Sequence, residues 1–360
     1  MDFCRLKKSK KEVNKFMSYI ELDNIIYSIQ KYGGISTYWS ELNSRLDKHI
    51  EGPIIRSSGS KYMRLYSPYS EAKIFHSSHF RTSSNRSTKN VVTIHDLIYE
   101  KGLIKGPGKY INLYERRKAL ISADAIITIS HSTLNDMKEF YGKLVESKPT
   151  FVIHHGCNIP LIDSTDQDIS NIDLDQNLES KLKSGLFFMF VGSRTGYKNF
   201  TTLLDAYLEG NFHHSGIVLI CTGSKFNNNE KKLIEMRKLK QFVFSVGLVD
   251  KITLNFLYSR SISLVYPSLY EGFGLPPLEA MAAGCPVICT NSSSLPEVIG
   301  NAGELVSPSS VSELAESMSK VINNEVRNSL IKKGFERAKI FNWENCIKKH
   351  VDVYSYLVSP

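Results

Sequence analysis

Residues 266–297 read YPSLYEGFGLPPLEAMAAGCPVICTNSSSLPE: a strand end, a glycine-proline loop, a helix of small residues and a second strand. Pro267 directly follows an apolar strand expected at 263–266, so the chain leaves the sheet there. Pro276 and Pro277 suit the first turn of a helix, because no internal N–H bond is lost in that turn. This order of elements predicts a parallel βαβ unit.

The same alternation of strands and helices runs along the chain on both sides of a polar stretch at 161–184. The clearest apolar strands are expected at residues 91–94, 125–130, 186–192 and 217–222. We therefore predict an α/β protein with two doubly wound, Rossmann-like domains, at 17–160 and 185–341, joined by a linker at 161–184. Residues 342–360 are predicted to form a terminal helix.

The composition is that of an ordinary globular protein, with 42% hydrophobic and 22% charged residues in a chain of 360. No apolar run approaches the roughly 18 residues that cross a membrane, and the N-terminal segment lacks the apolar core of a signal peptide. The six cysteines show neither metal-ligand nor disulfide spacing. These features favour a cytoplasmic protein.

The positive charge of the chain is confined to its first half. Residues 1–158 hold 25 basic and 15 acidic side chains, whereas the remainder holds 20 and 21. A basic surface suits an anionic partner such as phospholipid, a phosphorylated acceptor or nucleic acid, although it can also serve solubility alone. The first sixteen residues are either a basic tail or precede a true start at Met17; their basic members are Arg5, Lys7, Lys8, Lys10, Lys11 and Lys15.

Two carboxylates, Glu271 and Glu279, flank the glycine-proline loop with seven residues between them. Gly272 and Gly274 let the backbone approach a ligand closely, and the N–H groups at the start of the following helix form an anion site. Because carboxylates accept hydrogen bonds from vicinal hydroxyls, the pair predicts a site for the two sugar rings of a nucleoside diphosphate sugar. The alternative is a capped helix with solvated carboxylates.

The segment PSLYEGFGLP at 267–276, followed by Glu279 and Ala280, resembles the E-x7-E signature of family 4 glycosyltransferases, which are retaining enzymes of the GT-B fold. The similarity also includes FVGSR at 190–194, KN at 198–199, GCPVI at 284–288 and LPEV at 295–298. It covers essentially residues 18–357. The resemblance implies two domains that face each other across a cleft, with the terminal helix at 342–360 crossing back to the first domain.

The resemblance also implies roles for the residues of the signature. Glu271 would contact hydroxyls of the donor sugar, and Glu279 would contact the ribose. The backbone amides that would hold the sugar or the diphosphate belong to Gly272, Phe273, Gly274 and Leu275.

Arg194 and Lys198 follow the strand expected at 186–192, and Gly192 ends that strand. Two cations at the carboxyl end of a strand suit a diphosphate, because fixed positive charge stabilises the leaving oxygen more in the transition state than before it. The resemblance places both cations on the donor diphosphate. The alternative is an exposed arginine and an exposed lysine on a loop.

We expect neither a metal nor another cofactor, because these cations can neutralise the diphosphate. The sequence Asp173-Leu174-Asp175 matches the Asp-x-Asp pattern of metal-dependent glycosyltransferases, but it lies in the predicted linker. We interpret it as solvated charge. The nucleoside diphosphate sugar itself is counted as a substrate.

The first domain is expected to supply the acceptor side. Gly33 and Gly34 follow its first strand and open a helix with Ser36, which predicts a loop that a ligand can approach. The resemblance places this loop beside the donor phosphate and the acceptor. His95 ends the strand expected at 91–94, and the resemblance places it close to the reacting sugar, although most single histidines are structural.

Three further residues are weaker candidates on the acceptor side. Asp96 is expected to cap a turn or to orient His95, and Ser130 to contact substrate or to cap the helix that follows. His76 ends another expected strand. Ser130 is followed by His131, where the resembled family often has Glu or Lys, and this leaves the acceptor open.

Taken together, the sequence predicts a retaining hexosyltransferase that moves a sugar from a nucleoside diphosphate sugar to a glycan or a polyprenyl-diphosphate-linked acceptor. O-antigen, capsule or exopolysaccharide synthesis at an anionic inner membrane surface fits the basic first domain. The alternatives are a sugar epimerase, a synthase of a soluble glycoside, or a non-catalytic sugar-nucleotide binder. We expect no nucleic-acid partner, since no aromatic-basic platform is found. Donor sugar, base, linkage and oligomeric state stay open.

Overall fold

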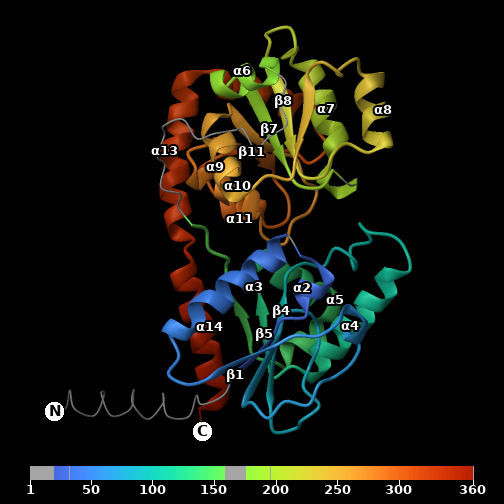
Figure 1. The fold of residues 1–360 in the computed structure, drawn as a ribbon, viewed down its shortest axis with the longest axis vertical. Helices are drawn as coiled ribbons and strands as arrows, with labels where there is room; N and C mark the ends of the chain where they lie inside the picture. The colour runs from blue at the N-terminus through green and yellow to red at the C-terminus, as the bar shows by residue number, and fades with distance from the viewer. Residues whose placement is uncertain (1–19, 32, 159–175, 195, 360) are drawn as a thin grey trace, which may run out of the picture. The chain divides into compact units, whose positions relative to one another are not determined.

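The computed structural model describes residues 20–31, 33–158, 176–194 and 196–359, which form two compact units (Figure 1). The first unit runs to Gly156 and resumes at Asn342, whereas the second extends from Cys157 to Phe341. The C-terminal segment therefore belongs to the first unit, although 185 residues of the second unit separate it in sequence from the rest of that unit.

Two predicted segments fall partly or wholly outside the described residues. These are the basic tail at 1–16 and the linker, in which residues 159–175, including the Asp173-Leu174-Asp175 sequence, are not described. The end of the predicted linker is described as helix α6 (Gln176–Ser184), which buries Leu182 and lies in the second unit. An apolar side chain thus anchors the last turn of the helix at the end of this segment.

The first unit is built on a six-stranded sheet in the order β2-β1-β3-β4-β5-β6, and every pair is parallel. The strands are β1 (Ile20–Asp23), β2 (Ile54–Ser57), β3 (Ile74–Ser77), β4 (Lys89–Ile94), β5 (Ala125–Thr128) and β6 (Thr150–Val152). Successive side chains of a strand point to opposite faces. Accordingly, Val91 packs in one apolar cluster and Val92 in another, so both faces of the sheet are covered.

Helices cover both faces of the first sheet (Figure 1). They are α2 (Ile26–Ile29), α3 (Gly34–Arg45), η1 (Leu46–Lys48), η2 (Lys61–Met63), α4 (Gly108–Ser122), α5 (His131–Glu146) and α14 (Trp343–Val358). Trp39 of α3 and Ile347 of α14 share one buried cluster, whereas Leu120 of α4 and Met137 of α5 share the other. The terminal helix α14 is thus part of the core of the first unit.

Gly156 marks the place where the chain leaves the first unit. A β-carbon at this position would collide with the backbone of Asn342 and Trp343, where the chain returns to start α14. A residue without a side chain is therefore required where the outgoing and returning segments pass each other.

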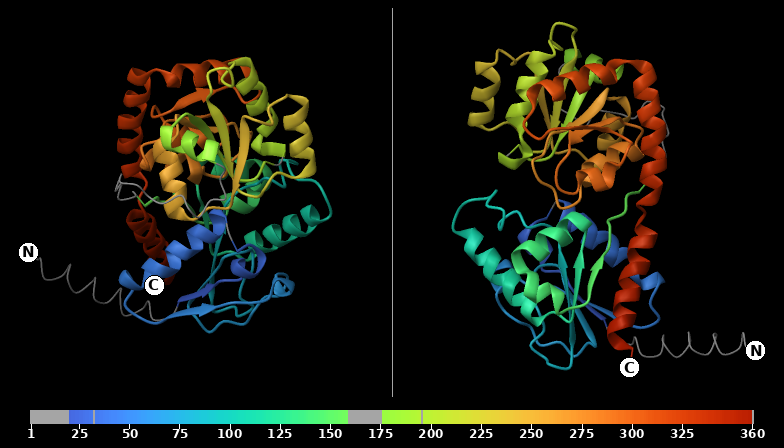
Figure 2. Two further views of the ribbon diagram at one scale, coloured as in Figure 1. Left: turned by 45° about the horizontal axis from the view of Figure 1, so that its top comes forward. Right: turned by 180° about the vertical axis from the view of Figure 1, so that it is seen from behind.

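The second unit has a six-stranded sheet in the order β12-β11-β10-β7-β8-β9, also parallel throughout (Figure 2). Its strands are β7 (Phe187–Val191), β8 (Val218–Thr222), β9 (Val243–Gly247), β10 (Ser263–Tyr266), β11 (Val287–Thr290) and β12 (Glu304–Val306). The strand order reverses between β7 and β10. In open parallel sheets, ligands bind beyond the carboxyl ends of the strands at such a reversal.

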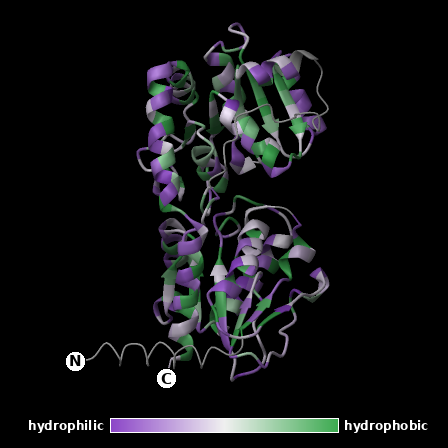
Figure 3. Ribbon diagram, turned by 60° about the vertical axis from the view of Figure 1, so that its left-hand side comes forward, coloured by the Kyte–Doolittle hydropathy of each residue, from purple (hydrophilic) through white to green (hydrophobic). Residues whose placement is uncertain are grey.

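The helices of this unit lie on both sides of its sheet. They are α6, η3 (Gly196–Lys198), α7 (Phe200–Glu209), α8 (Asn228–Met236), α9 (Lys251–Arg260), α10 (Leu275–Ala282), α11 (Leu295–Ile299), α12 (Val311–Ile322) and α13 (Asn324–Ile340). Leu203 of α7 and Met318 of α12 pack on Phe188 and Phe190 of β7. Figure 3 shows apolar strands and polar outer helix faces in both units.

The sequence failed to predict β2 and β12. Both are edge strands of three or four residues, and most of their side chains stay partly exposed, so neither has the continuous apolar run of a buried strand. Across the described ranges, every helix is too short or too polar to cross a bilayer.

Candidate functional site

The loop after β10 and the helix α10 that follows it carry the two carboxylates that the sequence singled out, Glu271 and Glu279. Gly274 caps α10 with a φ of +109°, and a β-carbon there would lie 2.9 Å from the Leu295 side chain. Pro276 and Pro277 occupy the first turn of α10, as expected from their missing N–H groups. The loop is therefore held in one shape by residues that tolerate few replacements.

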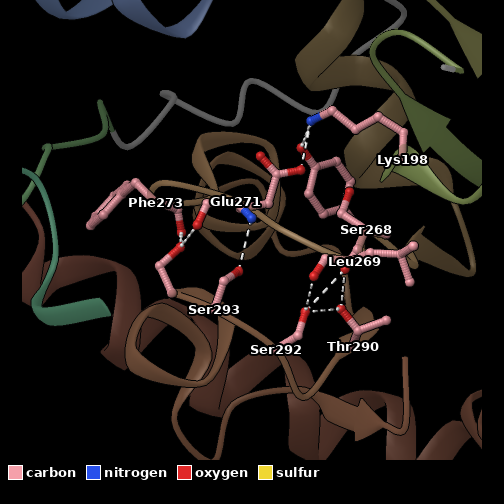
Figure 4. A network of polar contacts seen from close by, with 10 residues as sticks. Lys198, Ser268, Leu269, Glu271, Phe273, Thr290, Ser292 and Ser293 are labelled. Carbon is pink, nitrogen blue, oxygen red and sulfur yellow. Dashed lines mark hydrogen bonds and ion pairs between the residues drawn. The ribbon is translucent and has the colours of Figure 1, made fainter. Parts of the chain in front are cut away.

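Two serines after β11 fix the backbone around Glu271 (Figure 4). The Glu271 N–H donates to Ser293 Oγ at 2.8 Å. Ser294 Oγ donates to the carbonyl oxygens of Glu271 and Phe273, at 2.9 and 2.8 Å. No role was predicted for these serines, because contacts between the loops after β10 and β11 depend on the two strands lying side by side.

The beginning of the same loop is held in a similar way (Figure 4). Ser292 Oγ donates to the carbonyl oxygens of Ser268 and Leu269, at 3.2 and 3.0 Å. Thr290 Oγ1 also donates to the Ser268 carbonyl. Side chains from one strand end thus satisfy the polar backbone of the neighbouring loop.

Lys198 and Glu271 form an ion pair at the reversal of the strand order. Lys198 Nζ lies 2.6 Å from Glu271 Oε1 and donates to the Tyr266 phenol oxygen at 2.7 Å. The two charged side chains are 12% and 13% exposed, so the pair is largely buried but still in contact with solvent. Burial raises the pKa of Tyr266 well above its usual value, and the Glu271 carboxylate adds to this, so the phenol stays neutral.

This pair has the chemistry of a site for a polar anionic ligand. Glu271 offers carboxylate oxygens that accept hydrogen bonds, and Lys198 offers a cation that an anionic group can attract away from it. The sequence predicted both residues, and the parallel neighbours β7 and β10 bring them together over 73 positions of chain.

Arg194 is held quite differently. Its side chain has no exposed surface, and its guanidinium donates to the carbonyl oxygens of Thr222, Ser224 and Lys225 in the loop after β8. Arg194 Nε lies 3.1 Å from Glu230 Oε1. In the structure, the Arg194 side chain thus bonds the loop after β8, whereas the Lys198 side chain pairs with Glu271. A diphosphate contact by Arg194 would require some of these bonds to open.

Glu279 lies in the second turn of α10, after the two prolines. Burial raises the pKa of its carboxyl to about 7, while the Lys251 ammonium acts in the opposite direction. The protonated and ionised forms are therefore both populated near neutral pH. Of the other predicted donor residues, Gly192 directly follows β7, Gly272 lies in the loop after β10, and Leu275 is the first residue of α10.

In the first unit, His95 directly follows β4. Burial lowers its pKa to about 3, so the imidazole is neutral. Its ring nitrogens are closed to solvent, and neither has a hydrogen-bond partner among the described residues. The ring lies edge-on to Tyr38 at 5.0 Å between centroids. A buried polar group without a partner is uncommon in proteins, and it agrees with the predicted substrate contact without testing it.

The other candidates of the first unit make local bonds. Asp96 Oδ1 accepts from the Ile98 N–H at 3.2 Å, which is the capping expected of it. Ser130 Oγ accepts from the Thr133 N–H at 3.0 Å as the N-cap of α5. Ser36, on the first turn of α3 after Gly33 and Gly34, donates to the Gln30 carbonyl at 2.6 Å. None of these bonds tests a contact with substrate.

His76 belongs to a buried network that the sequence did not reveal. His76 bonds Tyr354 of α14 at 2.7 Å and Thr93 of β4 at 2.8 Å, while His350 of α14 bonds Tyr38 of α3 at 2.5 Å. We call these five side chains the histidine network. It attaches the terminal helix to the first sheet, so His76 has a structural role in this unit.

Comparison with known proteins gives a family match for most of the second unit. Residues 173–337 match the family described as Glycosyl transferases group 1. The chain is 34% identical to the O-antigen chain mannosyltransferase B of Escherichia coli over 178 residues, which are 48% of this chain and 46% of that protein. It is 36% identical to the MMP alpha-(1->4)-mannosyltransferase of Mycolicibacterium hassiacum over 140 residues, which are 37% and 34% of the two proteins. The matches span less than half of either relative.

Solved structures with a similar fold cover nearly the whole chain. Sucrose-phosphate synthase from Thermosynechococcus elongatus matches with a TM-score of 0.71 at 19% identity, over 94% of this chain and 99% of that one. WaaG, a glycosyltransferase involved in lipopolysaccharide biosynthesis, matches with a TM-score of 0.69 at 14% identity, over 93% and 99%. The predicted α/β fold of GT-B type is confirmed.

Proposed function

Because residues 173–337 match the group 1 glycosyl transferases, within a chain of the GT-B fold, we propose that this protein is a glycosyltransferase of cell-surface polysaccharide synthesis. The observation that carries the proposal is the Lys198–Glu271 pair at the strand reversal of the second unit. It joins a hydroxyl-binding carboxylate to a cation suited to phosphate, and a nucleoside diphosphate sugar needs both.

In the proposed reaction the bond between the sugar carbon and the diphosphate oxygen breaks, and negative charge develops on that oxygen. When the donor binds, Lys198 turns from Glu271 to the diphosphate, so its positive charge is already in place to stabilise the leaving oxygen as the bond opens. Glu271 then accepts hydrogen bonds from hydroxyls of the sugar. A charge fixed by its surroundings is effective here because little reorganisation is needed during the reaction.

We propose that the product keeps the configuration of the donor. The new bond forms on the face that the diphosphate leaves, and the proton of the acceptor hydroxyl passes to the leaving phosphate oxygen. Lys198 supplies positive charge at this step, so we propose that no metal or other cofactor is required. His95, neutral and without a hydrogen-bond partner in the described ranges, is proposed to contact a substrate hydroxyl.

The relatives suggest the sugar. Several are named as mannosyltransferases, including two that act on O-antigen chains. We therefore propose mannose as the transferred sugar and a growing glycan or a polyprenyl-diphosphate-linked oligosaccharide as the acceptor. The basic first half suits an anionic membrane surface, and hence a cytoplasmic protein held at the inner face of the membrane.

The test combines donor binding with product analysis. Thermal-shift titration with GDP-, UDP-, ADP- and dTDP-sugars identifies the donor, and NMR of the product anomeric proton gives the stereochemistry. Glu271→Gln keeps the shape of the side chain but removes its charge, so transfer should fall at least about a hundredfold, whereas the loss of the ion pair should lower stability by only about 1 kcal/mol. Glu304→Gln, which alters an exposed ion pair with Lys320 in the same unit, is the matched control.

Two outcomes would overturn the proposal. Full transfer by Glu271→Gln would remove the central role of the pair. Tight donor binding without transfer or hydrolysis, under a range of acceptors, would indicate a sugar-nucleotide binder instead. An inverted product, or activity that disappears with EDTA and returns with magnesium, would correct the mechanism.

A further inference from the structure

Two segments of the first unit expose an unusual number of tyrosine and aliphatic side chains. One is residues 61–69, which follow β2 and include η2, and the other is the first two turns of α4. Tyr62 is 84% exposed and Tyr110 is 74% exposed, so neither contributes to a core. We call the set the tyrosine patch; it consists of Tyr62, Met63, Leu65, Tyr66, Tyr69, Tyr110, Ile111 and Tyr114.

Polar contacts hold the two segments side by side. Arg64 donates from Nε and from its terminal nitrogen to the two carboxylate oxygens of Glu115, at 2.6 and 2.5 Å. Lys118 Nζ donates to the Leu65 carbonyl at 3.3 Å and to Ser67 Oγ at 3.0 Å. The loop therefore lies along α4, and its apolar side chains are presented from a fixed support.

The surroundings of the tyrosine patch are strongly basic. Residues 61–69 and 105–118 contain seven basic side chains and one acidic side chain, Glu115, which is buried against Arg64. Lys61, Lys105 and Arg117 are exposed. Amphipathic tyrosines, aliphatic side chains and unneutralised lysines and arginines together match a lipid surface with anionic headgroups.

Other occupants fit less well. A neutral glycan is recognised by aromatic faces together with carboxylates and amides, and it gains little from aliphatic side chains or positive charge. The centre of a protein–protein interface tends to be depleted of lysine. An exposed apolar patch bounded by basic residues therefore favours an anionic bilayer over either alternative.

We propose that the tyrosine patch docks the first unit on an anionic lipid surface. Its two segments follow the carboxyl ends of β2 and β4, the edge at which ligands approach such a sheet. Docking there brings a lipid-linked acceptor to the acceptor-side unit. Only this delivery of the acceptor rests on the proposed function, because binding to the lipid surface needs neither donor nor acceptor.

The test is co-sedimentation of the full chain with vesicles of phosphatidylcholine alone or of an equimolar mixture with phosphatidylglycerol. Binding should require phosphatidylglycerol and weaken as salt is raised. The double variant Tyr62→Ser/Tyr110→Ser should bind at least about tenfold more weakly, since two aromatic side chains no longer enter the interface. The control Met236→Ser/Ile322→Ser removes two exposed apolar side chains of the second unit and should bind like the unchanged protein.

A charge series separates the electrostatic part. Lys105→Gln/Arg117→Gln should weaken binding about 25-fold, or about fivefold for each charge. Lys332→Gln/Lys333→Gln makes the same change of charge on α13 and should have a much smaller effect. All of these side chains are exposed, so the melting temperatures should stay unchanged.

The proposal is overturned if the unchanged protein ignores anionic vesicles at low salt, or if patch and control variants bind alike. It is also overturned if the patch variants instead lose retention on immobilised polysaccharide, which would assign the patch to a glycan. A chain that binds vesicles through the patch but transfers no sugar would contradict the proposed function and leave the docking surface intact.

Discussion

The charged pair of the second unit and the histidine network of the first unit both place polar groups in apolar surroundings, but they are satisfied in opposite ways. In the histidine network, neutral imidazoles and phenols bond one another, and burial keeps them neutral. In the charged pair, Lys198 and Glu271 neutralise each other beyond the end of a strand, where both side chains stay slightly exposed to solvent. The groups of the histidine network are satisfied by one another and hold the fold, whereas a charged pair can change partners when a ligand arrives.

His95 and Arg194 test this distinction. His95 is an unsatisfied group beside the satisfied network, and Arg194 is a paired cation close in sequence to the exchangeable pair. His95 lies beside the histidine network but has no hydrogen-bond partner among the described residues. Arg194 is only four positions from Lys198 in the connection after β7 but is fully enclosed by carbonyl oxygens and Glu230. By this reasoning the unsatisfied histidine is the better candidate for substrate contact, and the satisfied arginine for holding the β8 loop.

The largest effect should follow from removing Lys198. Lys198→Ala takes away the cation that stabilises the leaving diphosphate, so kcat should fall about a thousandfold. Stability should change by about 1 kcal/mol, because the pair is partly exposed to solvent. Lys320→Ala breaks an exposed pair in the same unit and should leave kcat within about twofold. Equal losses of kcat in Lys198→Ala and Lys320→Ala would show that the Lys198–Glu271 pair has no special part in transfer.

The next effect concerns Arg194. Arg194→Met leaves Glu230 without its cation and several carbonyl groups without a donor, so the free energy of unfolding should fall by about 3 kcal/mol. Urea unfolding measures this loss. Arg194→Met should lose far more stability than Lys198→Ala, and Glu230→Gln in the Arg194→Met background should restore part of it.

Nucleotide binding decides whether Arg194 also has the predicted role. If the folded Arg194→Met variant keeps its affinity for the nucleoside diphosphate, the residue positions the loop. A loss of affinity well beyond the loss of stability would instead support the predicted contact with the diphosphate.

Acid should weaken the first unit through the histidine network. Burial lowers the pKa of His350 to about 4, below its usual value near 6.5. Between these two pH values the imidazole is protonated in the unfolded chain but neutral in the folded state. Stability contributed by neutral His350 is complete above pH 6.5 and falls by about 3 kcal/mol as the pH decreases to 4. His76 shifts in the same direction.

Unfolding by urea at several pH values measures this dependence. The variant His350→Phe should be less stable at neutral pH, because Tyr38 loses its partner, but its stability should vary less with pH. His214→Gln changes an exposed histidine and is the control. A slope that His350→Phe leaves unchanged would show that other groups dominate acid unfolding.

The sequence predicted most strands and the loop around Glu271, because these depend on local signals. Buried parallel strands have continuous apolar runs, and glycine and proline mark the turn into α10. The pairing of Lys198 with Glu271 was not predicted, because the resemblance placed Lys198 on the donor diphosphate and Glu271 on the donor sugar. The edge strands β2 and β12 lack such a signal.

What escaped prediction depends on contacts between distant segments. Ser293 and Ser294 carried no predicted role, and their bonds to the Glu271 loop arise only because β10 and β11 are neighbours. His76 and Tyr354 are 278 positions apart. Arg194 and Lys198 looked alike in sequence, since no local pattern shows which of two loop cations points inward.

The smallest expected effect concerns Glu279, whose pKa burial raises to about 7. The predicted ribose contact needs the carboxylate, which accepts hydrogen bonds from two hydroxyls, so donor affinity should rise about tenfold from pH 6 to pH 8. Glu279→Gln should bind more weakly and without this pH dependence, as measured by calorimetric titration of the nucleotide sugar. Glu313→Gln, a carboxylate on α12, should leave the pH profile unchanged. A Glu279→Gln profile that still rises would assign the titration to another group and remove Glu279 from the donor site.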